Sequence, residues 1–260
     1  YIKVPWETYT TGEDCTSTTN KCWRIMSINS DGSLIILRDK PYSNQRFDNT
    51  VNTAAQIATN NYTINHGYND LLSNTPTPGH PEEYREYSEM YTYLYGSTGY
   101  QNTVIKLYNS ILQPLDVCLN KIYTYTGIND ITYSTTTNVT KTCDVSGKIN
   151  TVMVLPLRNQ YVRLLYSEEY LNSSTESTCN QNRQYQCRNQ NYMYNKLSYW
   201  TLNGYFNVSM QYINNILASG KEDGYSASSS IGVRPVVTLK SNVLITGGNG
   251  TQTTPYIIKY

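Results

Sequence analysis

Six cysteines are the side chains whose chemistry the sequence shows most directly: Cys15, Cys22, Cys118, Cys143, Cys179 and Cys187. Their spacing favours three local disulfides, Cys15–Cys22, Cys118–Cys143 and Cys179–Cys187, although six cysteines leave the connectivity open. A zinc site would need closely spaced Cys pairs or neighbouring His residues, and neither occurs. Reduced, buried cysteines are therefore the main alternative to the disulfides, ahead of a zinc site. Because disulfides persist in oxidising compartments, we expect a secreted or cell-surface protein.

Side chains suited to acid–base or nucleophilic catalysis are sparse. The two histidines, His66 and His80, lie in polar segments next to Gly or Pro, and no Gly-x-Ser-x-Gly motif occurs. The acidic pairs Glu82-Glu83, Glu168-Glu169 and Glu222-Asp223 are typical of solvated helix starts and turns rather than of a calcium site. We therefore expect no catalytic residues, no metal and no cofactor, and an enzyme is a minor alternative.

The residue types that favour a binding function are Tyr and Asn. Tyr supplies 27 of 260 residues and Phe only 2, so most of the aromatic surface carries a hydroxyl. Tyr and Trp give large rigid contact areas and Asn gives adaptable hydrogen bonds, which is the composition of recognition surfaces. The predicted ligand-binding residues are Tyr199, Trp200, Asn203, Tyr205, Asn207, Tyr212, Asn214 and Asn215. For Trp200 a buried place in its strand is the favoured alternative, and for the polar residues a plain solvated loop is an equal one.

Arg234 is predicted to be structural rather than catalytic. It stands inside the apolar run IGVRPVVTL, and an Arg inside a strand is rarely buried without a partner. We expect a buried ion pair or a clamp on backbone carbonyls that holds the C-terminal strands.

Composition narrows the class of protein further. The net charge of +1, from 20 Lys and Arg against 19 Asp and Glu, gives no electrostatic basis for nucleic-acid binding. No apolar run is long enough to span a membrane. The chain begins at Tyr1 rather than at Met, which favours removal of a signal or anchor segment. A membrane would then be reached only through an anchor that this sequence lacks.

The elements that must position these residues are mostly strands. A hairpin is predicted over 21–39, because two β-rich runs flank Asp31-Gly32. Apolar periodicity and charge predict helices over 81–95 and 102–113. The other predicted elements are a short helix at 51–59, a hairpin-like or irregular segment at 120–148, strands at 149–156, 199–205, 208–217 and 231–239, and a helical stretch at 159–171. The tail, 243–258, is predicted to be a strand, a glycine-rich turn and a short strand. Because βαβ alternation is absent, we predict an α+β fold with antiparallel sheets, two helices and long polar loops.

Three blocks of the sequence resemble a known group of proteins. They are CWRIMSINSDGSLIILRD (22–39), YMYNKLSYWTLNGY (192–205) together with IGVRPVVTL (231–239), and KSNVLITGGNGTQTTPYII (240–258). Together they resemble exported surface proteins of low-GC Gram-positive bacteria, some of which carry pilin-like or single-helix anchors. Their core is similar to the C-type-lectin-like fold of the formylglycine-generating-enzyme type, which the variable proteins of diversity-generating retroelements share.

The resemblance implies a single C-type-lectin-like domain over residues 1–260, in which 40–150 is an elaborated or inserted region. It also implies ligand display, with 199–230 as the segment whose composition fits a variable surface. Oxidase chemistry would require a redox cysteine pair, for which only Cys179 and Cys187 are candidates, and a structural disulfide is the favoured interpretation there.

We expect an extracellular or cell-surface binding domain of adhesin or receptor type, which recognises a glycan or a protein on a host or neighbouring cell. The alternative is a structural, pilin-like or surface-filament subunit that assembles with its own copies.

Overall fold

The computed structural model describes residues 1–47, 89–117, 124–125, 131–132, 157–176, 190–207 and 210–259. For 124–125, 131–132, 203–207 and 210–212 only the backbone is described. The predictions for 51–59, 149–156, most of 120–148 and the first half of the helix at 81–95 lie outside these residues.

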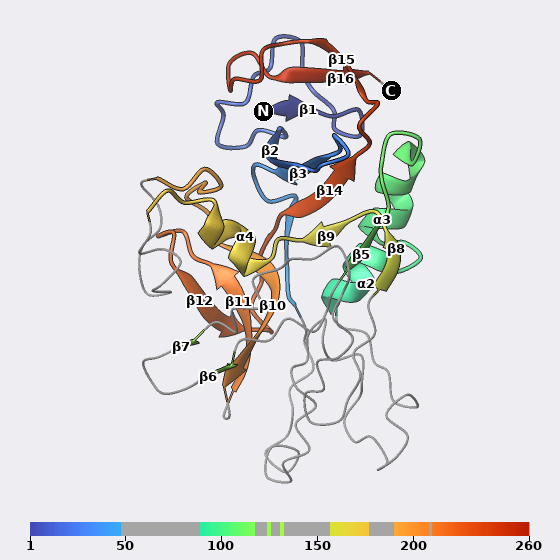
Figure 1. Ribbon diagram of the computed structural model, residues 1–260. Coiled ribbons are helices and arrows are strands. Elements are labelled where there is room, and N and C mark those ends of the chain that lie inside the picture. Colours follow the sequence, from blue (N-terminus) through green and yellow to red (C-terminus); the bar gives the residue numbers. More distant parts are fainter. Residues whose placement is uncertain are drawn as a thin grey trace.

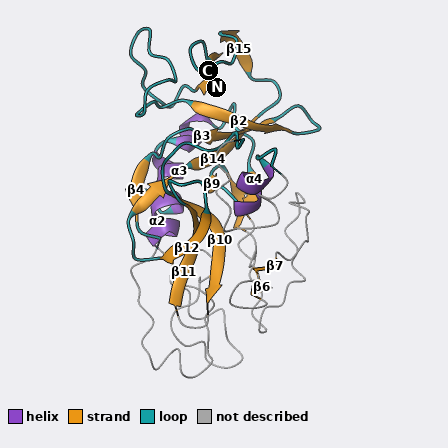
Figure 2. Cartoon of the chain, turned by 90° about the vertical axis from the view of Figure 1, so that its left-hand side faces the viewer, coloured by secondary structure: helices purple, strands orange, loops and turns teal. Residues whose placement is uncertain are grey.

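One sheet contains both the first and the last described strands. Within the described residues it has seven strands in the order β15-β16-β1-β2-β3-β14-β9. Their bounds are β1 Ile2–Lys3, β2 Trp23–Ile28, β3 Leu34–Arg38, β9 Arg163–Leu164, β14 Pro235–Leu239, β15 Leu244–Gly247 and β16 Tyr256–Lys259. The pairs are antiparallel except β1 with β16, which run parallel, so the first and last strands lie side by side (Figures 1 and 2).

The predicted hairpin over 21–39 is confirmed as β2 and β3. Gly32 adopts φ +81 in its turn, a conformation that glycine tolerates best. The Asp31 carboxylate stabilises the turn by accepting hydrogen bonds from the Ser33 backbone N–H and hydroxyl at 3.0 and 2.6 Å. The tail is likewise confirmed as the hairpin β15–β16. In both hairpins the turn contains glycine residues with positive φ, so residues close in sequence favour the turn.

A second sheet has five strands among the described residues, in the order β12-β11-β10-β13-β4. Their bounds are β4 Ser43–Gln45, β10 Tyr199–Asn207, β11 Met210–Ile216, β12 Glu222–Ser226 and β13 Ile231–Val233. The predicted strands at 199–205 and 208–217 are thus confirmed as the antiparallel pair β10–β11. Two-stranded pairs are also formed by β5 Leu115–Val117 with β8 Leu157–Gln160, and by β6 Thr124–Tyr125 with β7 Ile131–Thr132.

Two chain segments cross from one sheet to the other, side by side. The predicted strand 231–239 divides at Arg234 into β13 in the five-stranded sheet and β14 in the seven-stranded sheet. The partner segment leaves β3, passes through 39–42 and becomes β4, while the Tyr42 N–H donates to the Val233 carbonyl at 2.8 Å. Gly232 is needed here, because a Cβ at this position would lie 2.6 Å from Pro41 Cγ. We call this region, residues 38–42 with 232–235, the sheet crossing.

The helices are short and differ from the prediction. Helix α2 (Glu89–Tyr95) confirms the C-terminal half of the helix predicted over 81–95. The helix predicted over 102–113 is wrong: α3 spans only Tyr100–Thr103 and a 3-10 turn, η2, follows at Ile105–Tyr108. The backbone of 111–113 instead bonds to the edge of β14, where the Lys240 N–H donates to the Ile111 carbonyl and the Gln113 N–H donates to the Thr238 carbonyl, both at 2.9 Å. Tertiary pairing therefore overrides the helical periodicity.

The helical stretch predicted at 159–171 is also mostly wrong. Residues 157–164 form β8 and β9, and only Ser167–Asn172 is helical, as α4. Arg163 and Leu164 of β9 pair with the edge of β14. This pairing makes the segment a strand where its sequence predicts a helix.

Apolar side chains are buried on both faces of the β3–β14 pair. Ile36 and Val237 face a cluster that contains Trp23, Met90 and Leu94. Neighbouring Leu37 and Val236 face a second cluster with α4 and β10, whose members include Leu165, Tyr170 and Ile216. Helices α2 and α3 lie on one side of the molecule and α4 on the other (Figure 1). The architecture is α+β-like, with sheets predominating, and no helix in the described part of the chain is long and apolar enough to cross a membrane.

Candidate functional site

The predicted binding residues divide into two groups along the β10–β11 hairpin. At its root, Tyr199, Trp200 and Asn214, together with Asn215, are at most 1% exposed. Toward its tip the backbone register sets Tyr205 opposite Tyr212, and Asn207 opposite Met210. The other tip residue is Asn203, and the side chains of these tip residues lie outside the described part of the structure.

The root of the hairpin is interior and not an open surface, which corrects the predicted recognition face for Tyr199, Trp200, Asn214 and Asn215. β10 is a central strand between β11 and β13, and the molecule covers both of its faces. Successive side chains of a strand point to opposite faces, so both alternating sets are buried here. The alternation of side chains along the strand therefore does not separate surface residues from core residues here.

Trp200 illustrates this burial. Its Nε1 donates to the Gln45 carbonyl at 2.8 Å, and its ring packs edge-on against Phe47 with centroids 5.6 Å apart. The indole therefore ties β10 to the end of β4. The alternative favoured for Trp200 from the sequence, a core aromatic, is the arrangement the structure has.

Asn215 is different from its neighbours because its buried amide has no hydrogen-bond partner at either atom among the described residues. It lies opposite both Trp200 and Asp223 in the sheet. Asn215 is therefore an unsatisfied polar group at the root of the hairpin. Burying an amide without hydrogen-bond partners lowers the stability of the folded protein.

Arg234 clamps the sheet crossing. Its side chain is fully buried; Nε donates to the Arg38 carbonyl at 2.8 Å and Nη1 to the Met193 carbonyl at 3.1 Å. The guanidinium also lies 4.4 Å from the centroid of the Tyr199 ring, a favourable cation–π geometry. Of the two arrangements expected from the sequence, a buried ion pair or a backbone clamp, the structure has the backbone clamp.

A buried carboxylate, Asp39, organises the charges beside this clamp. Asp39 is 0% exposed; it pairs with the Arg24 guanidinium, and Asn20 Nδ2 donates to its second oxygen at 2.8 Å. Burial by itself would raise the pKa of Asp39, but Arg24, the Asn20 hydrogen bond, Arg234 and Lys40 outweigh it and hold that pKa below its usual value. Asp39 is therefore ionised at neutral pH and binds cationic neighbours.

The same charge network reaches the chain around residue 192. Arg24 donates to the Tyr192 carbonyl, and its guanidinium lies 5.2 Å from the Tyr1 ring and 5.8 Å from the Tyr192 ring. Asn195 Nδ2 adds a hydrogen bond to the Asp39 carbonyl at 2.7 Å. Segments that are far apart in sequence thus meet at one buried polar cluster.

The Cys15–Cys22 disulfide is present and closes the loop that contributes Asn20 to this cluster. Both cysteines are fully buried. Within the loop that they close, Asn20 donates to the Cys15 and Ser17 carbonyls as well as to Asp39. Cys118, Cys143, Cys179 and Cys187 lie outside the described residues, as do His66 and His80.

Two of the carboxylates singled out in the sequence form ion pairs, while Glu82 and Glu83 lie outside the described residues. Glu169 pairs with Arg163 at 2.5 Å, and Asp223 pairs with Lys221 at 2.8 Å. No group of three His, Cys, Asp or Glu side chains that could hold a metal ion occurs in the described ranges. Both ion pairs join residues that are close in sequence, Arg163 with Glu169 and Lys221 with Asp223.

The sequence contains a signal for the burial of Asp39 and Arg24. Both are charged residues within or next to apolar strands, WRIMSI and LIILRD. The rule that singled out Arg234 applies equally to them.

Comparison with protein-family models, with curated proteins and with solved structures finds no match for this chain.

Proposed function

We propose that this chain is an extracellular recognition domain that binds a glycan or a protein of another cell through the tip of the β10–β11 hairpin. The tip comprises Asn203, Tyr205, Asn207 and Tyr212. One observation carries the proposal: the hairpin is firmly held at its root and extends beyond the sheet crossing toward the end of the molecule away from β15 (Figure 1).

The root provides the rigidity that a recognition element requires. Trp200, Tyr199 and Ile216 are fully buried, and Tyr199 packs against the Arg234 guanidinium. A strand pair anchored in this way presents its distal residues with little loss of conformational entropy on binding. The backbone register sets Tyr205 opposite Tyr212, and these two residues are proposed to act together.

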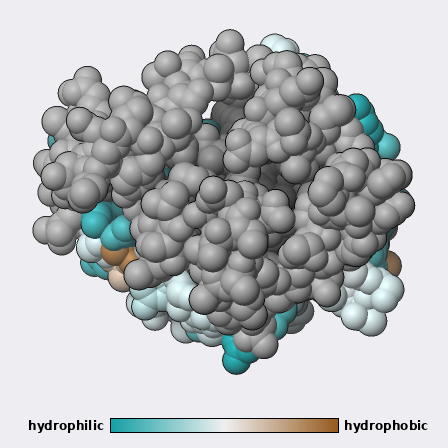
Figure 3. Space-filling view, turned by 90° about the horizontal axis from the view of Figure 1, so that it is seen from below, coloured by the Kyte–Doolittle hydropathy of each residue, from teal (hydrophilic) through white to brown (hydrophobic). Residues whose placement is uncertain are grey.

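Figure 3 views the molecule from the end toward which the hairpin points. The few described atoms in sight lie at the rim and are mostly hydrophilic or neutral, with small hydrophobic spots. Recognition through hydrogen bonds and stacking is proposed from the Tyr and Asn residues of the tip.

We assign the C-type-lectin-like fold on the resemblance of the three sequence blocks, and two structural facts support it. Strands from all three blocks, β2, β3, β14, β15 and β16, lie in one sheet, and β10 and β13 of the second block are neighbours in the other. The sheets are mainly antiparallel and carry short helices at their sides. The Cys15–Cys22 disulfide supports an oxidising, extracellular location.

The test is a binding screen of the oxidised protein against a glycan array and against intact host and bacterial cells, with and without EDTA. We expect binding that EDTA leaves unchanged and that Tyr205→Ala and Asn207→Ala each weaken about tenfold or more. Tyr192→Ala serves as the matched control, because Tyr192 is 47% exposed and lies beside the sheet crossing rather than on the hairpin.

Three outcomes would argue against the proposal. Loss of binding in EDTA would indicate a metal-dependent site. Equal effects of Tyr192→Ala and Tyr205→Ala would move the site away from the hairpin. Absence of binding together with higher-order assembly in the same sample would favour the second candidate function, a structural surface subunit. Leu244 and Ile245 of the edge strand β15, which are 60% and 44% exposed, support that candidate.

A further inference from the structure

The short loop that the Cys15–Cys22 disulfide closes is bonded to the rest of the fold at three places. The Cys15 N–H donates to the Gln252 carbonyl, and the Asp39 N–H donates to the Cys22 carbonyl, both at 2.8 Å. Between these two contacts, Asn20 Nδ2 donates to the Asp39 carboxylate, also at 2.8 Å. The loop therefore connects the N-terminal segment, the end of β3 and the C-terminal tail.

Asn20 is the residue through which this loop reaches the charged interior. It is buried, whereas residues 16–19 of the loop are exposed. Its Nδ2 also donates to the Cys15 and Ser17 carbonyls at 3.0 and 2.7 Å, and its Oδ1 accepts a hydrogen bond from the Cys22 N–H at 3.0 Å. One side chain thus binds both ends of the bridge and the buried carboxylate of Asp39.

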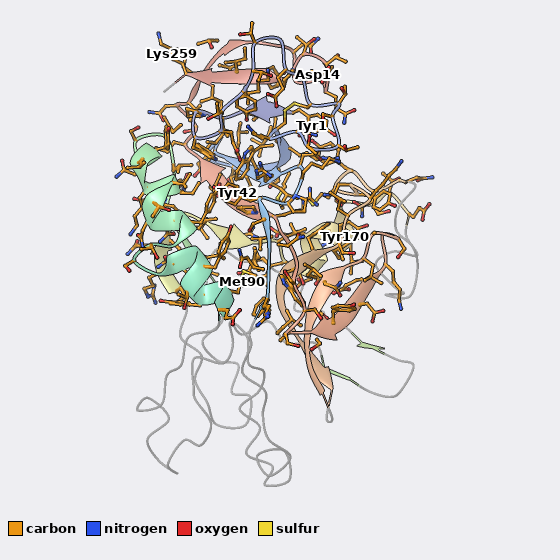
Figure 4. The ribbon with its side chains drawn as sticks, turned by 180° about the vertical axis from the view of Figure 1, so that it is seen from behind. Tyr1, Asp14, Tyr42, Met90, Tyr170 and Lys259 are labelled. Atoms are coloured by element: carbon orange, nitrogen blue, oxygen red, sulfur yellow. A yellow bond between two sulfur atoms is a disulfide. The ribbon has the colours of Figure 1, made fainter. Side chains whose placement is uncertain are left out.

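The bridge itself is closed to solvent, because Cys15 and Cys22 are fully buried. Reduction of a disulfide requires direct attack of a thiolate on one of its sulfur atoms. A reductant therefore reaches this bridge only after the loop has moved away from the fold. Figure 4 shows Asp14, the residue before Cys15, at the same end of the molecule as Tyr1 and far from Met90, so the loop begins at an outer end of the described core.

We infer that Asn20 and the disulfide form a redox-sensitive latch on the buried Arg24–Asp39 pair. With the bridge intact, the loop stays closed and Asn20 remains bonded to Asp39. Reduction by a dithiol breaks the Sγ–Sγ bond: two electrons and two protons pass from the dithiol to the two cysteine sulfur atoms, and the dithiol becomes a cyclic disulfide.

Reduction opens the latch because of the conformational freedom of the loop. Without the bridge, closing the loop over Asp39 costs more conformational entropy. Asn20 then spends a larger fraction of the time away from Asp39, and the ion pair with Arg24 becomes accessible to water. The oxidised state is therefore the one in which the sheet crossing is covered, and this inference does not rest on the proposed ligand binding.

The coupling between the bridge and the hydrogen bond acts in both directions. Because such a coupling is a free energy shared by two events, losing the bond from Asn20 to Asp39 must favour opening of the loop and so ease reduction of the bridge. A bridge that only constrains the unfolded chain would leave this opening of the folded protein unchanged. The rate at which the folded protein is reduced distinguishes the two cases.

The experiment is reduction of the folded, oxidised protein by dithiothreitol, followed by alkylation and mass spectrometry of the peptide that contains Cys15 and Cys22. Peptide mapping keeps this bridge separate from the other cysteines. We expect Asn20→Ala to be reduced about tenfold or more faster than the wild type, because it loses a hydrogen bond to a charged group. Thr18→Ala is the matched control, because Thr18 is exposed in the same loop, and it should react at the wild-type rate.

The dependence of the reduction rate on urea distinguishes opening of the loop from global unfolding. Local opening exposes little surface, so the rate should change little at low urea concentration. Hydrogen exchange of the double variant Cys15→Ala, Cys22→Ala gives the reciprocal measurement. The Asp39 amide should exchange about tenfold or more faster than in the wild type, whereas the amides of β12 should not.

Asn20→Ser, which keeps a polar group but shortens the side chain, is a second variant if Asn20→Ala does not fold by circular dichroism. Equal reduction rates for the wild type and the folded Asn20 variant would overturn the inference. So would an equal acceleration by Thr18→Ala, or a reduction rate that rises steeply with urea in step with global unfolding. An Asp39 amide that exchanges at the wild-type rate in the double variant would also contradict it.

Discussion

At the scale of single residues, the most informative side chains are charged groups buried between the sheets. Arg234 donates to the carbonyls of Arg38 and Met193, while Arg24 pairs with Asp39. Buried charges are costly unless they are fully paired or hydrogen-bonded. These residues therefore join segments that are distant in sequence. Removing one partner leaves the other group buried without compensation and lowers the free energy of unfolding.

Replacing Arg234 by Met tests the backbone clamp. Arg234→Met leaves two buried carbonyls without donors and removes the cation above Tyr199, so we expect a loss of about 2–4 kcal/mol in the free energy of unfolding. Urea denaturation measures it. Arg158→Met is the control, because the Arg158 side chain is 68% exposed in its ion pair with Asp116, and it should change stability by less than about 1 kcal/mol. Full stability of Arg234→Met would contradict the clamp.

Asp39 should make stability depend on pH in the acid range. Its pKa is lower in the folded protein than its usual value, about 3.9 in unfolded chains. Its contribution to stability is therefore complete above about pH 4 and is lost as the pH falls through the lower folded-state pKa. Asp39→Asn should be destabilised by about 3 kcal/mol at neutral pH and should lose less stability than the wild type on acidification. Parallel stability curves for the two proteins from pH 7 to pH 2 would contradict this.

At the scale of elements, loops and hairpins are held by particular anchors. The polar loop between Cys15 and Cys22 supplies Asn20 to the buried Asp39. The β10–β11 hairpin is held by Trp200 at its root. In both cases a buried hydrogen bond, from Asn20 to Asp39 or from Trp200 to the Gln45 carbonyl, fixes the position of the segment.

Removing the disulfide should loosen the loop that it closes. The two cysteines are seven residues apart, and the chain-entropy model gives about 2–3 kcal/mol for closing so short a loop. We expect the double variant Cys15→Ala, Cys22→Ala to lose about this much stability in urea denaturation. Ser17→Ala, within the same loop and exposed, should change stability by less than about 0.5 kcal/mol. An unchanged midpoint for the double variant would show that the bridge does not constrain the unfolded chain.

At the scale of the whole molecule, the sheet crossing joins the two sheets. β3 with β4, and β14 with β13, are continuous chain segments that enter both sheets. Arg234, Asp39 and Arg24 lie where these segments change sheet. A disturbance of the crossing therefore affects both sheets at once.

This arrangement predicts one cooperative unfolding unit for the two sheets. Native-state hydrogen exchange should give similar opening free energies for the core amides of β3 and β11, and Arg234→Met should lower both by the same amount. The shorter pair β5–β8 serves as a comparison within the same experiment, because it belongs to neither sheet. Separate opening free energies for β3 and β11, or a decrease in one sheet only, would indicate two independent units.

Local sequence signals were sufficient for the elements whose structure depends on near neighbours. The turn at Asp31-Gly32 and the glycine-rich tail each specify a hairpin, because a positive φ and an Asp side chain act within a few residues. The strands of 199–217 follow from their β-rich composition. The run around Arg234 predicted a buried structural arginine, because an Arg within an apolar strand requires partners.

The helical periodicity of 102–113 failed because Ile111 and Gln113 bond to the neighbouring β14, a partner more than a hundred residues away. Other root residues of the hairpin, including Tyr199 and Asn214, are predicted from the sequence to lie on a surface, because the sequence does not reveal that β10 is covered on both faces.

The sequence by itself determined the strand-rich class, the two local hairpins, the Cys15–Cys22 pairing as the favoured one, and the need for a partner at Arg234. Only the tertiary structure decided that β13 and β14 lie in different sheets, that Asp39 binds Arg24, and that the hairpin root is interior. These features depend on contacts between distant segments, and the free energy of such contacts is set by which surfaces meet rather than by any one segment.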